Sequence, residues 1–268
     1  MKRSIIYLVA FVAIQLIVSY LVSFLWLLAD GCTAAEAWAR FAAPYADGIN
    51  ASLFIVQSAA YSLVTMILFI LLKWADVSPH YLRQRQWGVF AWAVVASLGT
   101  IVPSLALQDL MPPLPDVTRE AFRQIIDNDY GYFTICLFAP LVEEIVFRGA
   151  VLRALLKTMP HPALAVTVSA VFFAAVHFNP AQMPHAFLVG LLLGWMAWRT
   201  GSILPGVAFH WANNTIAFAV CRLMPHWDDM TLLEIFRGSQ RSLVMAIAFS
   251  MLILLPALYQ LHVSMKRV

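Results

Sequence analysis

The chain of 268 residues has little charge. Asp, Glu, Lys and Arg make up 12% of it, whereas hydrophobic residues make up 62% and the mean hydropathy is +0.80. Soluble domains carry about 25% charged residues, so the composition excludes an ordinary soluble domain. We predict an all-α integral membrane protein with several spans, because helices satisfy their own backbone hydrogen bonds inside a bilayer.

The sequence also lacks several other features. Its three cysteines, Cys32, Cys136 and Cys221, have no paired spacing, which favours neither a disulfide framework nor a thiolate metal site. Long Gly/Ser linkers, low-complexity tracts and internal repeats are missing, so we expect one integral membrane domain over residues 1–268. The net charge of +3 comes without a basic stripe that contains aromatic residues, and it therefore gives no indication of nucleic-acid binding.

The apolar runs leave room for about eight spans joined by short loops, since a crossing needs about 20 apolar residues. The first run is too long for the core of a signal peptide, and we expect it to remain as an anchor. The candidate spans are residues 5–28, 52–72, 89–107, 133–156, 163–178, 186–198, 203–223 and 243–261. The fifth and sixth are short for a full crossing.

Loop charges predict the orientation of these spans. In an eight-span arrangement one side receives Lys2, Arg3, Lys73, Arg83, Arg85, Arg153, Lys157, Arg199, Lys266 and Arg267. The other side receives Asp30, Glu36, Asp47, Asp109, Asp116, Glu120, Asp127, Asp129, Asp228, Asp229 and Glu234. Basic loops remain in the cytoplasm, so both termini are predicted to be cytoplasmic.

The span 133–156 carries charges at the expected depth of the membrane. Its run Glu-Glu-Ile-Val-Phe-Arg contains Glu143, Glu144 and Arg148. Each ionised side chain there costs about 2.5 to 3.5 kcal/mol on insertion scales. Glu144 and Arg148 are four residues apart and can pair on one helix face, whereas Glu143 is rotated by about 100° and has no such partner. An unpaired acid inside the membrane indicates a functional site or a proton path.

Two later spans add polar groups at a four-residue interval. Phe173 precedes His177, and His210 precedes Asn214, so each pair is predicted to lie on one face of its helix. A lone buried histidine is usually a packing residue. Polar groups on three apolar helices are harder to explain in that way, because each unsatisfied polar group in hydrocarbon costs several kcal/mol.

These residue types suit peptide hydrolysis. A carboxylate and an imidazole can hold a water molecule and take its proton, while a second imidazole and an amide donate hydrogen bonds to the oxyanion. Glu143, His177 and His210 can equally bind a divalent metal such as zinc and leave a position open for water. The sequence leaves both chemistries open, so the cofactor is either such a metal or none. The zincin pattern His-Glu-x-x-His is excluded.

The three motifs resemble those of the CAAX-protease and bacteriocin-processing family of intramembrane proteases, which includes the type II CAAX prenyl endopeptidases. They cover a core at about residues 131–223. The resemblance implies an all-α membrane fold that encloses a polar cavity. It also implies that Glu143 and His177 activate water and that His210 and Asn214 stabilise the oxyanion. Glu144 and Arg148 are expected to organise the site, and Phe173 belongs to the same motifs.

The function predicted from these motifs is that of an intramembrane endopeptidase acting on membrane-associated proteins or peptides. The short chain and loops are similar to bacterial members of the family, which suggests the bacterial cell membrane. A proton-coupled transporter is the first alternative, because Glu and His chains also serve as relays. A non-catalytic scaffold or immunity protein is the second. Gly190-x-x-x-Gly194 predicts close helix packing, and His161, His185, His226 and His262 are expected to be interfacial.

Overall fold

The computed structural model describes residues 1–40, 50–77, 80–83, 85–224 and 230–266, and the regular secondary structure in these ranges is helical, as predicted. The elements are α1 (Lys2–Ala29), α2 (Ala34–Arg40), α3 (Ala51–Leu71), α4 (His80–Arg83), α5 (Trp87–Asp109), α6 (Arg119–Asp127), η1 (Phe133–Phe138), α7 (Ala139–Glu143), η2 (Glu144–Leu152), α8 (Arg153–Leu156), α9 (Pro162–Ala175), α10 (Met183–Thr200), α11 (Leu204–Leu223), α12 (Leu232–Ile235) and α13 (Gln240–Ser264). Of the residues used above, Asp47, His226, Asp228, Asp229 and Arg267 lie outside the described ranges.

Four helices, α1, α3, α5 and α13, are long and apolar enough to cross a membrane. They correspond to the first three candidate spans and the last one. The other four candidate spans are helical but do not meet that standard of length and apolarity within the described residues. α9 is only 14 residues long, and α10 and α11 contain prolines, histidines or asparagines among their apolar residues.

The candidate span 133–156 is not a uniform α-helix. It consists of the π-helix η1, the short helix α7, the π-helix η2 and the final turn α8. Pro140 stands in the first turn of α7 and has no N–H to donate to the preceding turn, which explains an irregularity at that point. Glu143 ends α7 and Glu144 begins η2, so the two acids lie at the junction between α-helical and π-helical backbone. Such interruptions are frequent at functional sites.

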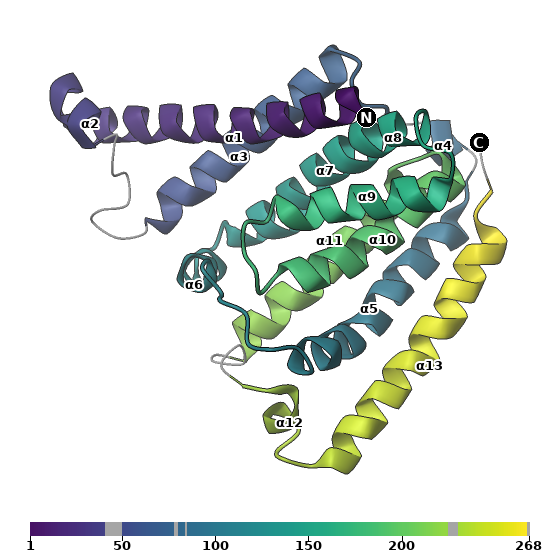
Figure 1. Ribbon diagram of the computed structural model, residues 1–268. Coiled ribbons are helices and arrows are strands. Elements are labelled where there is room, and N and C mark those ends of the chain that lie inside the picture. The colour runs from purple at the N-terminus through teal and green to yellow at the C-terminus, as the bar shows by residue number, and fades with distance from the viewer. Residues whose placement is uncertain (41–49, 78–79, 84, 225–229, 267–268) are drawn as a thin grey trace.

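Several helices pack as neighbouring pairs (Figure 1). α13 packs against α5, α1 against α3 and α10 against α9, and the interrupted segment is contacted by the α1–α3 pair and by the α9–α10 pair. The last pair approaches closely because Gly190 and Gly194 have no side chain. A Cβ on Gly190 would lie 3.1 Å from the Ala170 Cβ, and one on Gly194 would lie 3.0 Å from Val166 Cγ1. The predicted packing role of this Gly-x-x-x-Gly pair is confirmed.

Met1 and the carboxyl end of α13 lie at the same end of the molecule (Figure 1). The amino group of Met1 donates a hydrogen bond to Thr158, and Arg153 forms an ion pair with Asp76 at this end. At the other end Arg222 lies 3.7 Å from Asp129, so arginines are present among the acidic loops as well. The basic residue Arg153 and the amino terminus therefore lie at one end of the molecule, while Arg222 lies at the other end beside an acidic residue.

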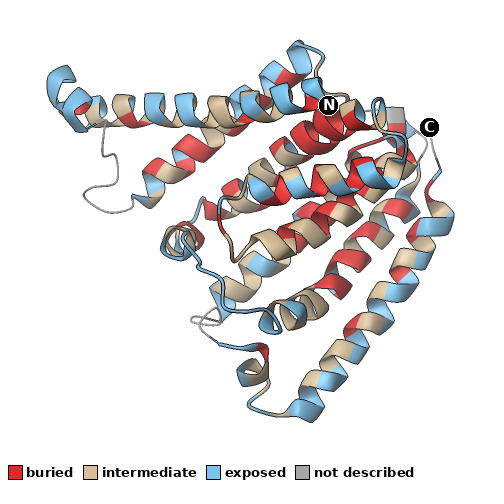
Figure 2. Ribbon diagram, in the orientation of Figure 1, coloured by how far each residue is buried: buried red, intermediate tan, exposed pale blue. Residues whose placement is uncertain are grey.

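The core lies in the middle of the chain. Buried residues are concentrated in η2, α9 and α10, and α3, α5 and α11 each have a buried face, whereas α1 and α13 are mostly exposed or half-buried (Figure 2). All nine residues of η2 are buried. Because η2 is surrounded by protein, its polar side chains must find partners on the neighbouring helices.

Candidate active site

A buried ion pair lies at the start of η2. Arg148 Nη1 donates to Glu144 Oε1 at 2.9 Å, and the two residues are 2% and 0% exposed. This confirms the pairing predicted from their four-residue spacing. Arg148 Nη2 also donates to the Gly190 carbonyl at 3.3 Å, and its Cζ atom lies 4.2 Å from the centre of the Phe173 ring. The guanidinium is therefore held by a carboxylate, a backbone carbonyl and an aromatic face.

His210 lies between the two glutamates. Its Nδ1 is 3.2 Å from Glu144 Oε1, and its Nε2 is 3.7 Å from Glu143 Oε2. The first distance is that of a hydrogen bond, and it fixes the direction of the ring. The second is longer than a hydrogen bond, so Glu143 and Nε2 are placed to contact a common water molecule or substrate oxygen. The Glu143 side chain is 20% exposed and the Glu144 side chain is 0% exposed, which makes Glu143 the acid that a ligand can reach.

The backbone of α11 approaches Glu144 closely at Gly206. A Cβ on Gly206 would lie only 2.8 Å from Glu144 Oε2. That oxygen is buried and has no hydrogen-bonding partner among the described residues, and neither has Arg148 Nε. Gly206 thus permits the approach that brings His210, one turn further along α11, to Glu144.

Phe173 links the predicted motifs physically. Its buried ring lies 5.0 Å from the His177 ring and 5.9 Å from the His210 ring, both nearly perpendicular to it. His177 itself is in the turn after α9, which ends at Ala175, and its Nδ1 lies 2.8 Å from the Phe173 carbonyl. The prediction that Phe173 and His177 share one helix face is therefore wrong: His177 lies in the turn after the helix, and this turn keeps the two rings in contact.

Asn214 is tied to the π-helix η1. Its Nδ2 donates to the Ile135 carbonyl at 3.0 Å. An amide nitrogen has two protons, so the second N–H of Asn214 remains for another acceptor. The structure thus joins α11 to the interrupted segment at two places, Glu144 with His210 and Ile135 with Asn214.

The structure brings together six of the seven predicted site residues through direct contacts: Glu143, Glu144, Arg148, Phe173, His177 and His210. Asn214 is on the same helix as His210. No direct contact between Glu143 and His177 is present among the contacts of the described residues, although these two were predicted to share a water molecule. The group that faces Glu143 is His210.

The metal hypothesis used Glu143, His177 and His210 as ligands. Within residues 1–40, 50–77, 80–83, 85–224 and 230–266, no group of three or more His, Cys, Asp or Glu side chains is arranged to hold a metal ion. His210 Nδ1 is directed to Glu144, and His177 Nδ1 to a backbone carbonyl. As placed, these residues do not fit a three-ligand set, and we derive no step through a metal.

Sequence reasoning missed a second polar cluster beside the site. His185, expected to be interfacial, is instead half-buried in the first turn of α10, where Nδ1 lies 3.1 Å from Ser104 Oγ and Nε2 lies 3.4 Å from Asn213 Nδ2. Its partners belong to α5 and α11, and no local spacing connects them to His185. The only local signal was the position of Asn213, three residues after His210.

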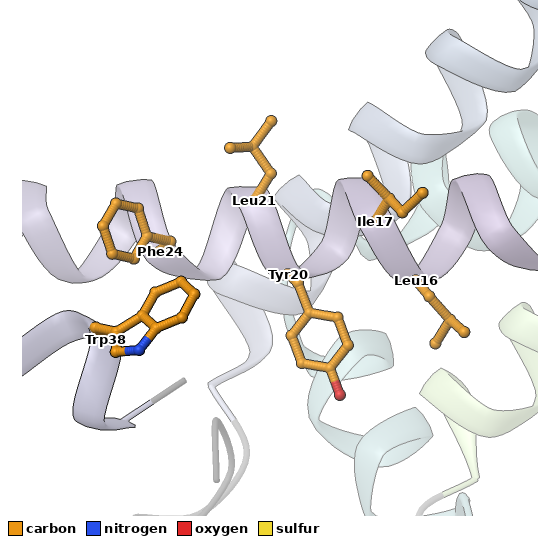
Figure 3. Close-up of a pocket in the computed structure, with 6 residues that line it drawn as sticks. All are labelled: Leu16, Ile17, Tyr20, Leu21, Phe24 and Trp38. Atoms are coloured by element: carbon orange, nitrogen blue, oxygen red, sulfur yellow. The ribbon is translucent and has the colours of Figure 1, made fainter. Parts of the chain in front are cut away.

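Two hollows lined by described residues are apolar and lie away from the site. One of about 380 Å³ lies on α1 and α2 and is lined by Leu16, Ile17, Tyr20, Leu21, Phe24 and Trp38 (Figure 3). Another, of about 300 Å³, is lined by residues of α3. Neither hollow is lined by any of the predicted site residues or by His185, so a polar cavity inside the bundle stays a prediction.

Residues 130–216 match the family model described as "Type II CAAX prenyl endopeptidase Rce1-like". This region of the chain is similar to that family. The matched region begins just before η1, ends within α11 and contains all seven predicted site residues. An Escherichia coli protein described as "Uncharacterized 24.3 kDa protein" is 27% identical over 181 residues, which cover 64% of this chain and 82% of the relative. No solved structure matches the chain.

Proposed function

We propose that the chain is an intramembrane endopeptidase that hydrolyses peptide bonds of membrane-associated proteins or peptides. The observation that carries this proposal is His210, whose ring lies between Glu143 and Glu144 inside the region that matches the Rce1-like family model. A buried ion pair, a bridging imidazole and a partly exposed acid together supply what water activation needs.

In the proposed reaction Glu143 accepts a proton from a water molecule, and the resulting hydroxide adds to the carbonyl carbon of the peptide. His177, which contacts the same Phe173 ring as His210, helps to hold that water. The proton then passes from Glu143 to the amide nitrogen as the carbon–nitrogen bond breaks. The products are a new carboxyl terminus and a new amine.

The oxyanion formed in this step needs hydrogen-bond donors. When both nitrogens of His210 carry a proton, Nδ1–H is held by Glu144 and Nε2–H faces the reacting atoms. The second N–H of Asn214 supplies the other hydrogen bond. Arg148 and Phe173 act indirectly, because they fix Glu144 and the His210 ring.

The proposed site lies within the membrane. We propose that the segment 133–156 and helices α9, α10 and α11 cross it together with α1, α3, α5 and α13, which gives about eight spans around a polar cavity. The polar atoms that lack partners in the described ranges, Glu144 Oε2 and Arg148 Nε, support a hydrated interior, since buried polar groups are normally satisfied by protein or water.

The test uses the full chain, purified in detergent, with a library of membrane-spanning peptides. The library includes a farnesylated cysteine peptide and its unmodified counterpart, and mass spectrometry identifies the products. We expect new peptide termini with the wild type, a loss of cleavage in His177→Ala and full cleavage in His161→Ala, a matched exposed histidine. Intact peptides throughout, together with solute uptake into liposomes driven by a pH gradient, would instead establish a transporter.

A further inference from the structure

The cluster of Ser104, His185 and Asn213 has no part in the reaction described so far. It joins three helices: Ser104 of α5, His185 of α10 and Asn213 of α11. Asn213 is 6% exposed, and it directly precedes Asn214 on α11, the helix that also carries His210. The cluster therefore adjoins the proposed site directly.

The hydrogen bonds of Ser104 determine where the protons of this cluster lie. Ser104 Oγ donates its only proton to the Ile101 carbonyl at 2.9 Å, so it must accept from His185. Nδ1 of His185 is then the protonated nitrogen of a neutral ring, and Nε2 carries the lone pair. Asn213 Nδ2 donates to that lone pair across 3.4 Å. The ring thus fixes which end of the Asn213 amide faces it.

The opposite end of the same amide is unpaired. Asn213 Oδ1 is buried and has no hydrogen-bonding partner within the part of the chain that the structure describes. A buried carbonyl oxygen without a donor costs about 1 to 3 kcal/mol. Asn213 follows His210 by three residues, so both side chains extend from one face of α11. An unpaired acceptor therefore lies on the same face of α11 as His210.

A peptide that is cleaved inside a membrane needs hydrogen-bond acceptors for its backbone N–H groups near the scissile bond. Around the scissile bond its backbone must leave helical structure, and each freed N–H then needs an acceptor, because lipid offers none. In the proposed reaction His210 and Asn214 supply donors for the peptide carbonyl, whereas none of the roles assigned above is that of an acceptor for a peptide N–H. Asn213 Oδ1 is a carbonyl oxygen and can accept a hydrogen bond from such an N–H.

We propose that Asn213 Oδ1 accepts a hydrogen bond from a backbone N–H of the bound peptide, and that His185 is a positioning residue that aims this oxygen. The inference rests on the proposed peptidase function and adds a substrate-binding group to it. The neighbouring Asn214 has a different role, because its amide nitrogen is anchored on Ile135.

The experiment is a double-substitution cycle. One change removes a backbone N–H from the peptide substrate, and the other removes the Asn213 side-chain oxygen from the protein. The probe is a library peptide that the wild type cleaves, made also as a series in which one amide N–H at a time, other than that of the scissile bond, is replaced by an ester oxygen. We expect one ester to lower kcat/KM of the wild type by about three- to tenfold, as befits one hydrogen bond. Asn213→Ala should lower kcat/KM for the parent peptide by a similar factor and show no further loss with that ester.

His185 is tested in the same series. His185→Phe removes the acceptor for Asn213 Nδ2, so the ester effect should shrink. His185→Gln should restore it, since the glutamine amide can accept from Asn213 and donate to Ser104. If Asn213→Ala does not fold, this pair of variants carries the test alone.

The outcomes separate the two proposals. If the wild type cleaves no peptide of the library, the peptidase function itself fails and this inference fails with it. If the wild type cleaves but every ester costs the same in Asn213→Ala, or in His185→Phe, as in the wild type, Asn213 does not bind the peptide N–H, and the peptidase function stands without it.

Discussion

The outer helices α1 and α13 differ from the central helices of this chain in how much of their surface the protein covers. In α1 and α13 only 6% and 11% of the most apolar window is buried inside the protein, whereas every residue of η2 is buried. The outer helices are long, regular and apolar on all sides. The central group contains the interrupted segment with the buried Glu144 and Arg148, the short helix α9, and α11 with the buried His210.

This difference separates anchoring from chemistry. An apolar helix that faces lipid needs no partners, so substitutions on its surface are tolerated. A charged residue inside the central group depends on each neighbour, because an unpaired charge in a low-dielectric interior is expensive. Substitutions in the central helices should therefore change stability and activity more than substitutions on the outer ones.

The largest effect is expected from breaking the buried ion pair. Arg148→Ala leaves Glu144 buried without its cation and should lower the free energy of unfolding by about 3 to 5 kcal/mol. Arg153→Ala is the matched control, because its ion pair with Asp76 is half-exposed and should be worth at most about 1 kcal/mol. Thermal unfolding of both variants in detergent provides the measurement. Equal shifts would contradict the proposed difference between centre and periphery.

A smaller effect is expected from one methyl group at Gly206. The added Cβ would lie 2.8 Å from Glu144 Oε2, so in Gly206→Ala either the Glu144 carboxylate or the backbone of α11 must shift. We expect a loss of about 1 to 3 kcal/mol of stability, as in other overpacked sites, with reduced peptide cleavage. Gly88→Ala, in the exposed first turn of α5, meets no atom within 4 Å and should change neither property appreciably. Full activity of Gly206→Ala would show that the close approach is not needed.

The cap of α3 should matter for stability alone. Asn50 Oδ1 accepts a hydrogen bond from the Leu53 N–H at 3.0 Å and caps the first turn of α3. Asn50→Ala should cost about 1 kcal/mol in unfolding free energy, and the kcat/KM of the folded enzyme should stay at the wild-type value. A changed kcat/KM would indicate that α3 takes part in the chemistry.

The smallest effect is expected on the lipid-facing side of α1. Ile17 lines the apolar hollow of Figure 3 and is 66% exposed. Ile17→Ala should change the stability in detergent by no more than about 0.5 kcal/mol. A clear destabilisation, seen as a lower unfolding temperature, would mean that this face is packed against something other than detergent or lipid.

Much of the fold could be predicted from the sequence. Each apolar run contains helix, because the runs are long and bounded by polar loops, and the Glu144–Arg148 pair followed from a four-residue spacing. The π-helices η1 and η2 could not be foreseen, since local periodicity does not encode them beyond the presence of Pro140. The end of α9 at Ala175 was also missed, which placed His177 on a helix face instead of in a turn.

The site was predicted less completely, for a physical reason. Residue types inside apolar spans identify polar groups that need partners, but they do not say which partners these are. His210 was expected to act with Asn214, yet its closest contacts are Glu144 and Glu143 on another segment. His185 was treated as interfacial because its partners Ser104 and Asn213 are 81 and 28 residues away in the chain.

The most direct test of the proposed function is the rate of peptide cleavage by two matched acid variants of the purified protein. Glu143→Gln removes the proposed base at the site, and Glu120→Gln makes the same chemical change on an exposed helix. We predict that Glu143→Gln lowers kcat by about 100-fold or more, as expected for the loss of a general base, and that Glu120→Gln cleaves at the wild-type rate. Wild-type cleavage by a folded Glu143→Gln variant would contradict the account.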